Sequence, residues 1–153
     1  MKRRDKMITR QFFLLCLMVF LMCIIVQAQD GKNYKVLVNT SNPIKTISNT
    51  KLSKIFLKKI KSWEDGETIY PVDQMEESSV RSSFSSKVHK RSIAKIRSYW
   101  KKQIFNQKNS PPPQMLKDQD IINFVGSDPG AIGYVSESTR ITNGAVKVVS
   151  ITY

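Results

Sequence analysis

Hydrophobic and polar positions alternate in short stretches of the chain, and each stretch predicts a strand. The first covers Tyr34 to Asn39 and ends at the polar run Thr40-Ser41-Asn42-Pro43, so it reads as a strand feeding a loop. Further apolar, β-favouring stretches lie at Thr68 to Val72, at Ala131 to Val135 and at Ala145 to Ile151. The pattern therefore predicts at least four short strands.

Between these strands, apolar residues recur at the three- and four-residue spacing of amphipathic helices. Each helical stretch follows a residue whose side chain can accept a hydrogen bond from the first helical turn. In chain order these expected caps are one of Ser48, Asn49 and Thr50, then Ser78 or Ser79, then Ser92, then Asp118, and Gly126 is expected to close the last helix. Because strands and helices alternate, we predict an α/β fold with a mixed or mostly parallel sheet flanked by helices.

The first 28 residues have the layout of a secretory signal peptide. Lysine and arginine cluster before an apolar run from Phe12 to Val26, and Val26-Gln27-Ala28 resembles a cleavage site. As a helix this run would span about 22 Å, short of the roughly 30 Å of a bilayer core. We expect cleavage near Ala28 and a periplasmic or secreted protein, with an uncleaved anchor as the alternative.

Residues 29–153 remain after such a cleavage, enough for one compact domain. Both cysteines, Cys16 and Cys23, leave with residues 1–28, so no disulfide is expected. The whole chain has 25 basic and 12 acidic residues, and the first 28 hold five and one of these, which leaves a net charge of +9. A surface this basic attracts anions without selecting among them.

Residue types that catalyse reactions are sparse in this domain. Its one histidine, His89, lies in a basic stretch and is expected to be a solvated surface residue. We find no spacing of histidine, cysteine or carboxylates that suits a metal, and no serine with a plausible catalytic partner. We therefore expect neither an enzyme nor a cofactor.

Anion binding has a better physical basis. A helix that begins at Ser78 or Ser79 presents backbone N–H groups and hydroxyls to a phosphate-like ligand, and Arg81 lies one turn further on. Thr40 and Ser41 offer further donors from the loop after the first strand, because ligands of α/β sheets bind at loops beyond strand ends. The alternative is that the serines only cap the helix and Arg81 is a surface charge.

Several segments, in order, resemble the phosphate-binding proteins of ABC transporters. The run from Ile55 to Trp63 is similar to the "IFLGKI..W" run of that family, and Gly130 to Val135 matches its "GAIGYV". The resemblance covers about residues 35 to 150 and implies one lobe of a type II periplasmic binding protein. It also implies that phosphate or a similar oxyanion is bound, in association with phosphate uptake or sensing.

The resemblance carries over few of the family's ligand residues. The family's phosphate loop reads roughly Arg-Ser-Asp-Gly-Ser-Gly-Thr, and here only Asp73 and one of Ser78 and Ser79 correspond to it. Its leading arginine and its glycines have no match, and Arg81 stands at a different place in the motif. The expected site is thus Thr40, Ser41, Asp73, Ser78, Ser79 and Arg81.

Two other functions stay open at this point. The chain could be an interaction module that has lost its ligand and docks on a membrane transporter or sensor component. It could also bind polyanions or anionic membranes through the lysine-rich stretches Lys51 to Lys61 and Lys87 to Lys108, without specific nucleic-acid recognition. Whether two copies pair as a homodimer is likewise open.

Overall fold

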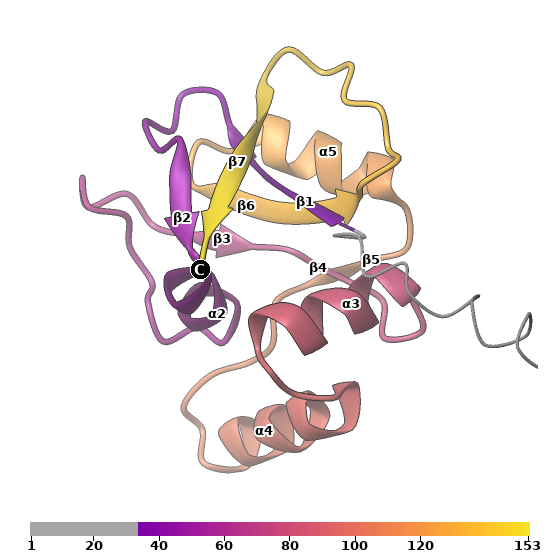
Figure 1. The fold of residues 1–153 in the computed structure, drawn as a ribbon. Coiled ribbons are helices and arrows are strands. Elements are labelled where there is room, and N and C mark those ends of the chain that lie inside the picture. Colours follow the sequence, from indigo (N-terminus) through magenta and orange to yellow (C-terminus); the bar gives the residue numbers. More distant parts are fainter. Residues whose placement is uncertain (1–33) are drawn as a thin grey trace, which may run out of the picture. The chain divides into compact units, whose positions relative to one another are not determined.

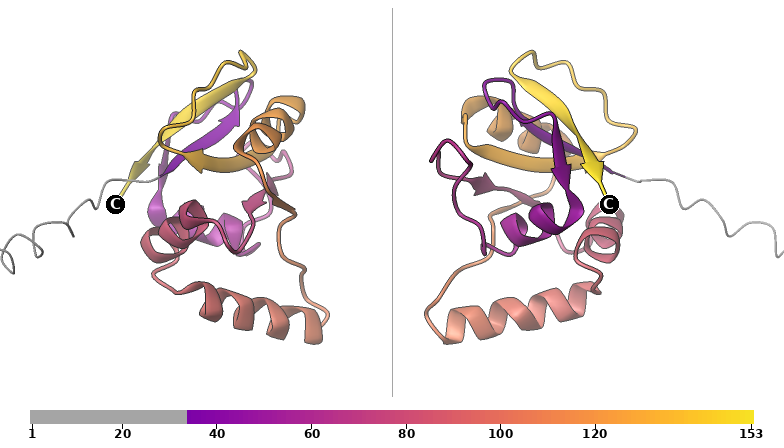
Figure 2. Two further views of the ribbon diagram at one scale, coloured as in Figure 1. Left: turned by 90° about the vertical axis from the view of Figure 1, so that its right-hand side faces the viewer. Right: turned by 60° about the vertical axis from the view of Figure 1, so that its left-hand side comes forward.

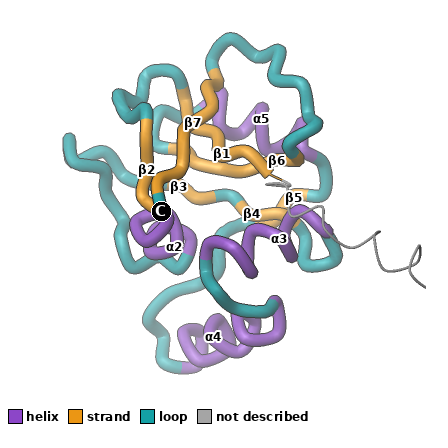
Figure 3. Tube along the Cα trace, in the orientation of Figure 1, coloured by secondary structure: helices purple, strands orange, loops and turns teal. Residues whose placement is uncertain are grey.

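The computed structural model describes residues 34–153, so the expected signal peptide lies outside the described part. The elements are β1 (Tyr34–Asn39), β2 (Thr46–Ser48), α2 (Asn49–Phe56), β3 (Tyr70–Pro71), β4 (Asp73–Gln74), α3 (Ser79–Val88), α4 (Ile93–Phe105), β5 (Gln114–Met115), α5 (Asp118–Ser127), β6 (Ala131–Ser136) and β7 (Val146–Thr152) (Figures 1 and 3). None of the helices within this range is both long and apolar enough to cross a membrane.

The main sheet has five strands in the order β2-β7-β1-β6-β3. The central strand β1 is antiparallel to β6 and to β7, whereas the outer pairs β2–β7 and β3–β6 are parallel. Strands β4 and β5 form a separate parallel pair. The prediction of a mixed sheet within an α/β fold is confirmed.

Helices cover both faces of the sheet. Tyr34, Val36 and Val38 of β1 point into the core shared with α2 and α3, and Leu37 points into the core shared with α5. This alternation follows from the two-residue period of a strand. Helix α4 lies beyond α3, away from the sheet (Figure 2), and packs Ile96 and Trp100 against Leu57. The region from β1 to β7 is thus a three-layer unit with α4 as an outer addition.

Serine caps begin three of the helices, as expected. The side chains of Ser48, Ser78 and Ser92 each accept a hydrogen bond from the backbone N–H three residues on. The fourth expectation is wrong, because Lys117 occupies the cap position of α5 and makes no side-chain cap bond. Asp118 is instead the first helical residue, and its carboxylate accepts hydrogen bonds from other segments of the chain.

Two positions of the Gly130 to Val135 segment have no room for a side chain, which explains the glycines there. A Cβ at Gly130 would lie 2.0 Å from the carbonyl oxygen of Thr68, and one at Gly133 would lie 2.6 Å from the Ile121 side chain. Gly130 is thus where the backbone of the Thr68 loop approaches closely, and Gly133 is where α5 packs on β6. Gly126, expected to close α5, lies inside that helix, which ends at Ser127.

Candidate oxyanion site

Strand β4 leads the chain from the sheet to the start of α3, and its residue Asp73 has three hydrogen-bonding or ionic partners. The Asp73 carboxylate accepts a hydrogen bond from the backbone N–H of Gln74 at 2.9 Å and one from the Tyr134 hydroxyl. Its other oxygen forms an ion pair with the Arg81 guanidinium. Burial raises the pKa of Asp73, and these three donors act in the opposite direction by stabilising the charged form.

Arg81 points into the protein and not toward solvent. Its side chain is only 3% exposed, and besides Asp73 its Nη1 donates to the carbonyl oxygen of Gln74 at 2.7 Å. The alternative of a surface charge is therefore wrong. Because the positive charge of Arg81 is balanced by Asp73 at contact distance, it adds little net attraction for an external anion.

The two serines at the start of α3 have different environments. Ser78 is partly buried, and its hydroxyl donates to the Gln74 side-chain oxygen at 2.7 Å while it caps the helix. Ser79 is the first helical residue and is exposed. A ligand at this helix start would thus meet the Ser79 hydroxyl and the N–H groups of the first turn.

Gln74 and Asp118 were not among the predicted site residues, yet their hydrogen bonds connect the segments around it. The Gln74 amide nitrogen donates to Asp118 at 2.7 Å and to the carbonyl oxygen of Tyr134 at 3.3 Å. Asp118 also accepts from the backbone N–H of Ser136 at 2.9 Å and from the Thr139 hydroxyl. These contacts join β4, α5 and the end of β6 beneath the start of α3.

Thr40 and Ser41 lie elsewhere in the molecule. Asn39, just before them, donates to the carbonyl oxygens of Val125 and Gly126 near the C-terminal end of α5, whereas Asp118 is at the other end of that helix. The two ends are about 15 Å apart along the axis of a ten-residue helix. The structure therefore brings Asp73, Ser78 and Arg81 together, with Ser79 beside them, and leaves Thr40 and Ser41 outside the group.

Acidic residues precede the helix start. Glu76 forms an ion pair with Arg97 of α4, and its carboxylate accepts from the Arg97 Nε at 2.9 Å. That contact lowers the pKa of Glu76. Glu77 is exposed in the turn just before Ser78. Negative charge at this place competes with an anion for the positive end of the helix dipole.

His89 differs from the expectation of a solvated residue. It is the C-cap of α3, it forms a 2.9 Å hydrogen bond between its Nδ1 and the Ser53 hydroxyl, and its ring packs edge-on against Phe84. Burial, and then the nearby charges of Arg81 and Arg91, lower its pKa to about 4. His89 is therefore neutral at pH 7, and its ring packs against Phe84 and bonds to Ser53. Across residues 34–153, no group of three or more histidine, cysteine or carboxylate side chains could hold a metal.

Comparison with solved structures shows the same fold in phosphate-binding proteins. An ABC-type phosphate transport receptor from Vibrio cholerae aligns with a TM-score of 0.60 at 18% identity, over 78% of this chain and 46% of the receptor. A chain from Clostridium perfringens with bound phosphate, assigned as a phosphate ABC transporter substrate-binding protein, aligns with a TM-score of 0.60 at 19% identity, over 78% and 44%. PstS from Borrelia burgdorferi aligns with a TM-score of 0.54 at 16% identity, over 79% and 48%.

This protein spans less than half the length of those structures. At such low identity the match concerns the fold. Among curated proteins, none matches the sequence. The family model described as a PBP superfamily domain matches residues 19–153. Members of this family are typically binding proteins without enzymatic activity. Since the model covers most of the chain, and since the fold agrees with part of the phosphate-binding proteins, the chain belongs to the PBP superfamily domain family.

Proposed function

We propose that this protein is an exported, non-enzymatic solute-binding protein that holds phosphate or a related oxyanion in association with ABC-type phosphate uptake or sensing. The observation that carries the proposal is the exposed start of α3, where Ser79 opens a ten-residue helix on top of a buried polar network. Such a helix start combines N–H donors with a positive dipole end. The phosphate held by the Clostridium perfringens relative agrees with this chemistry.

In this proposal Asp73 and Arg81 position the helix start and do not contact the ligand. Their mutual ion pair and the Arg81 bond to the Gln74 carbonyl fix the turn between β4 and α3. The ligand itself is held by Ser79 and by backbone N–H groups. Because the cation of Arg81 is already paired with Asp73, the ligand is held mainly by neutral donors and binds weakly, with a Kd on the order of 1 mM, which corresponds to about 4 kcal/mol.

Isothermal titration with phosphate, sulfate and chloride at matched ionic strength tests this. We expect phosphate binding that Ser79→Ala weakens severalfold. Ser86→Ala is the matched control, because Ser86 is also an exposed serine of α3 but lies far from its start. Equal heats for all anions that fade steeply with salt would instead favour a general polyanion binder acting through the basic surface.

A second candidate function is an interaction module that docks on a membrane transporter or sensor component. It is favoured by the end of α4, where Ile104 is 56% exposed and Phe105 is 87% exposed. Adjacent apolar side chains exposed to this extent are typical of a protein contact. A photo-crosslinking residue at position 105 should give a defined adduct in cells, and one at the exposed Lys59 should not. Equal labelling from both positions would count against the module.

A further inference from the structure

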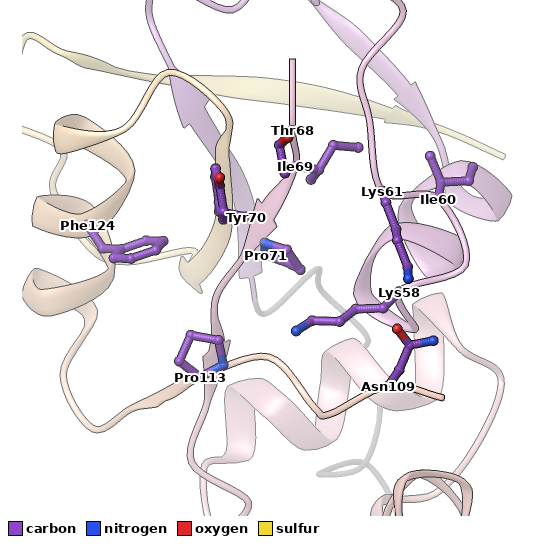
Figure 4. Close-up of a pocket in the computed structure, with 10 residues that line it drawn as sticks. All are labelled: Lys58, Ile60, Lys61, Thr68, Ile69, Tyr70, Pro71, Asn109, Pro113 and Phe124. Carbon is purple, nitrogen blue, oxygen red and sulfur yellow. The ribbon is translucent and has the colours of Figure 1, made fainter. Parts of the chain in front are cut away.

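A groove opens where four segments of the domain meet (Figure 4). The segments are the chain after α2, strand β3 with the residues before it, the loop after α4, and helix α5, which contributes Phe124. The groove has a volume of about 300 Å³, at the lower end of the range for small-molecule sites. Its lining includes Lys58, Lys61, Tyr70, Pro71, Pro113 and Phe124. None of them belongs to the candidate oxyanion site.

Lys58 holds an unusual backbone conformation at this groove. Its φ is 51°, in the left-handed region that favours glycine. The conformation is imposed by the end of α2, because the N–H of Lys58 donates to the carbonyl of Ile55 at 2.9 Å and that of Lys59 donates to Lys54 at 2.8 Å. A non-glycine residue in this region costs on the order of 1 kcal/mol.

The side chain of Lys58 is directed into the groove. It is half-buried, and its ammonium reaches toward Pro71 and Pro113 (Figure 4). Lys61 lines the same groove, and no aspartate or glutamate does. Burial, and then the charge of Lys61, lower the pKa of Lys58. Two cations at one opening without a lining carboxylate favour an anion between them.

The remaining walls are largely apolar. Tyr70 and Phe124 contribute aromatic rings, and Pro71 and Pro113 contribute flat apolar surface. Inorganic phosphate would leave these walls unused. An anion that carries a small aromatic or aliphatic group would place its charge at the lysines and its apolar part against the rings.

We propose that this groove binds a small organic anion, with a phosphate or carboxylate head between Lys58 and Lys61 and an apolar body against Tyr70 and Phe124. The site does not depend on the start of α3. It assigns a binding role to Lys58, at a position where the backbone favours glycine. It also predicts that this domain distinguishes organic anions from the bare oxyanion.

Nuclear magnetic resonance titration with phenyl phosphate tests the proposal, with inorganic phosphate and phenol as separate arms. We expect phenyl phosphate to perturb signals of Tyr70 and Phe124 at a concentration at least tenfold lower than either arm requires. Lys58→Gly should weaken this binding at least fivefold while it raises the melting temperature, because glycine accepts the left-handed backbone. Lys61→Gln should weaken binding without that rise.

Lys90→Gly is the matched control, because Lys90 also has a positive φ, 54°, but does not line this groove. It should raise the melting temperature and leave the phenyl phosphate titration of Tyr70 and Phe124 unchanged. The proposal is overturned if phenyl phosphate binds no better than its two parts, or if Lys58→Gly and Lys90→Gly leave the affinity equally unchanged. It is also overturned if both lower the affinity alike.

Discussion

Arg81 of α3 forms a buried ion pair with Asp73 of β4, and the pair fixes the turn between the sheet and the candidate oxyanion site. The Tyr134 hydroxyl completes the carboxylate's contacts, and the Tyr134 ring stacks on Phe84 of α3 at 3.8 Å between centroids. The polar network is thus continuous with the aromatic core. Its residues are placed to hold α3 against the sheet, whereas Ser79 beside them is exposed.

Breaking this ion pair should destabilise the fold strongly. Arg81→Met leaves the Asp73 carboxylate buried without its cation, which costs about 3–5 kcal/mol in the free energy of unfolding. The double variant Arg81→Met with Asp73→Asn should lose less than the sum of the two single changes. Urea unfolding measures both. Arg97→Met, at the exposed pair with Glu76, is the control and should cost far less, because solvent screens that pair.

His89 should make stability depend on pH below neutrality. Its pKa falls from 6.5 in the unfolded chain to about 4 in the folded protein, so the unfolded chain binds more protons between these values. Stability is full above pH 6.5 and declines as the pH falls toward 4, by on the order of 1–3 kcal/mol from this residue. Urea unfolding at pH 7, 5.5 and 4.5 should show the decline, and His89→Gln should flatten it. An unchanged slope in His89→Gln would assign the decline to other groups.

The close contact at Gly130 should tolerate no side chain. Gly130→Ala places a methyl group 2.0 Å from the Thr68 carbonyl oxygen, so the loop has to move, and the Gly130 carbonyl bonds to Tyr70 and Trp63 are lost or stretched. We expect a loss of about 2–4 kcal/mol by thermal or urea unfolding. Gly144→Ala is the control, since nothing lies within 4 Å of its Cβ, and it should change stability by less than about 0.5 kcal/mol.

Local features of the fold were predictable from the sequence because they depend on neighbouring residues. The caps Ser48, Ser78 and Ser92 follow from side chains that bond three residues on, and strand β6 follows from a continuous apolar run. The prediction that Asp118 caps α5 was wrong because of contacts with residues far away in the sequence. Its carboxylate is engaged by Gln74, 44 residues earlier in the chain, and by the end of β6.

The composition of the candidate site was predictable only in part. The predicted site requires that the loop after β1 and the start of α3 lie at one edge of the sheet, as parallel strands would place them. However, β1 is antiparallel to β6, with Tyr34 opposite Ser136 and Val38 opposite Ile132. Strand β3, which leads toward β4 and α3, is parallel to β6 and therefore runs opposite to β1. The loop with Thr40 and Ser41 thus lies at the opposite edge of the sheet from the start of α3. The inward direction of the Arg81 side chain was also not predictable from the sequence. It depends on the turn before α3, which brings Arg81 next to its partner Asp73.

Glu77 provides a test of the oxyanion proposal that leaves the fold intact. It is exposed in the turn that precedes α3, where its negative charge opposes an anion at the helix start. Glu77→Gln removes this charge and should strengthen phosphate binding about two- to fivefold at low salt, equivalent to about 0.3–1 kcal/mol. The gain should shrink at high ionic strength, because the charge is exposed and screened. Isothermal titration at two salt concentrations measures it.

Glu67→Gln is the control for that change. It removes the same charge from an exposed position before β3, so the net charge of the two variants is equal. If phosphate binds at the start of α3, only Glu77→Gln strengthens it, because Coulomb attraction across the domain is screened beyond about 10 Å at 0.1 M salt. If both variants strengthen binding equally, phosphate responds to the net charge of the surface and the site at Ser79 is wrong. The comparison therefore separates a local oxyanion site from diffuse attraction to a basic protein.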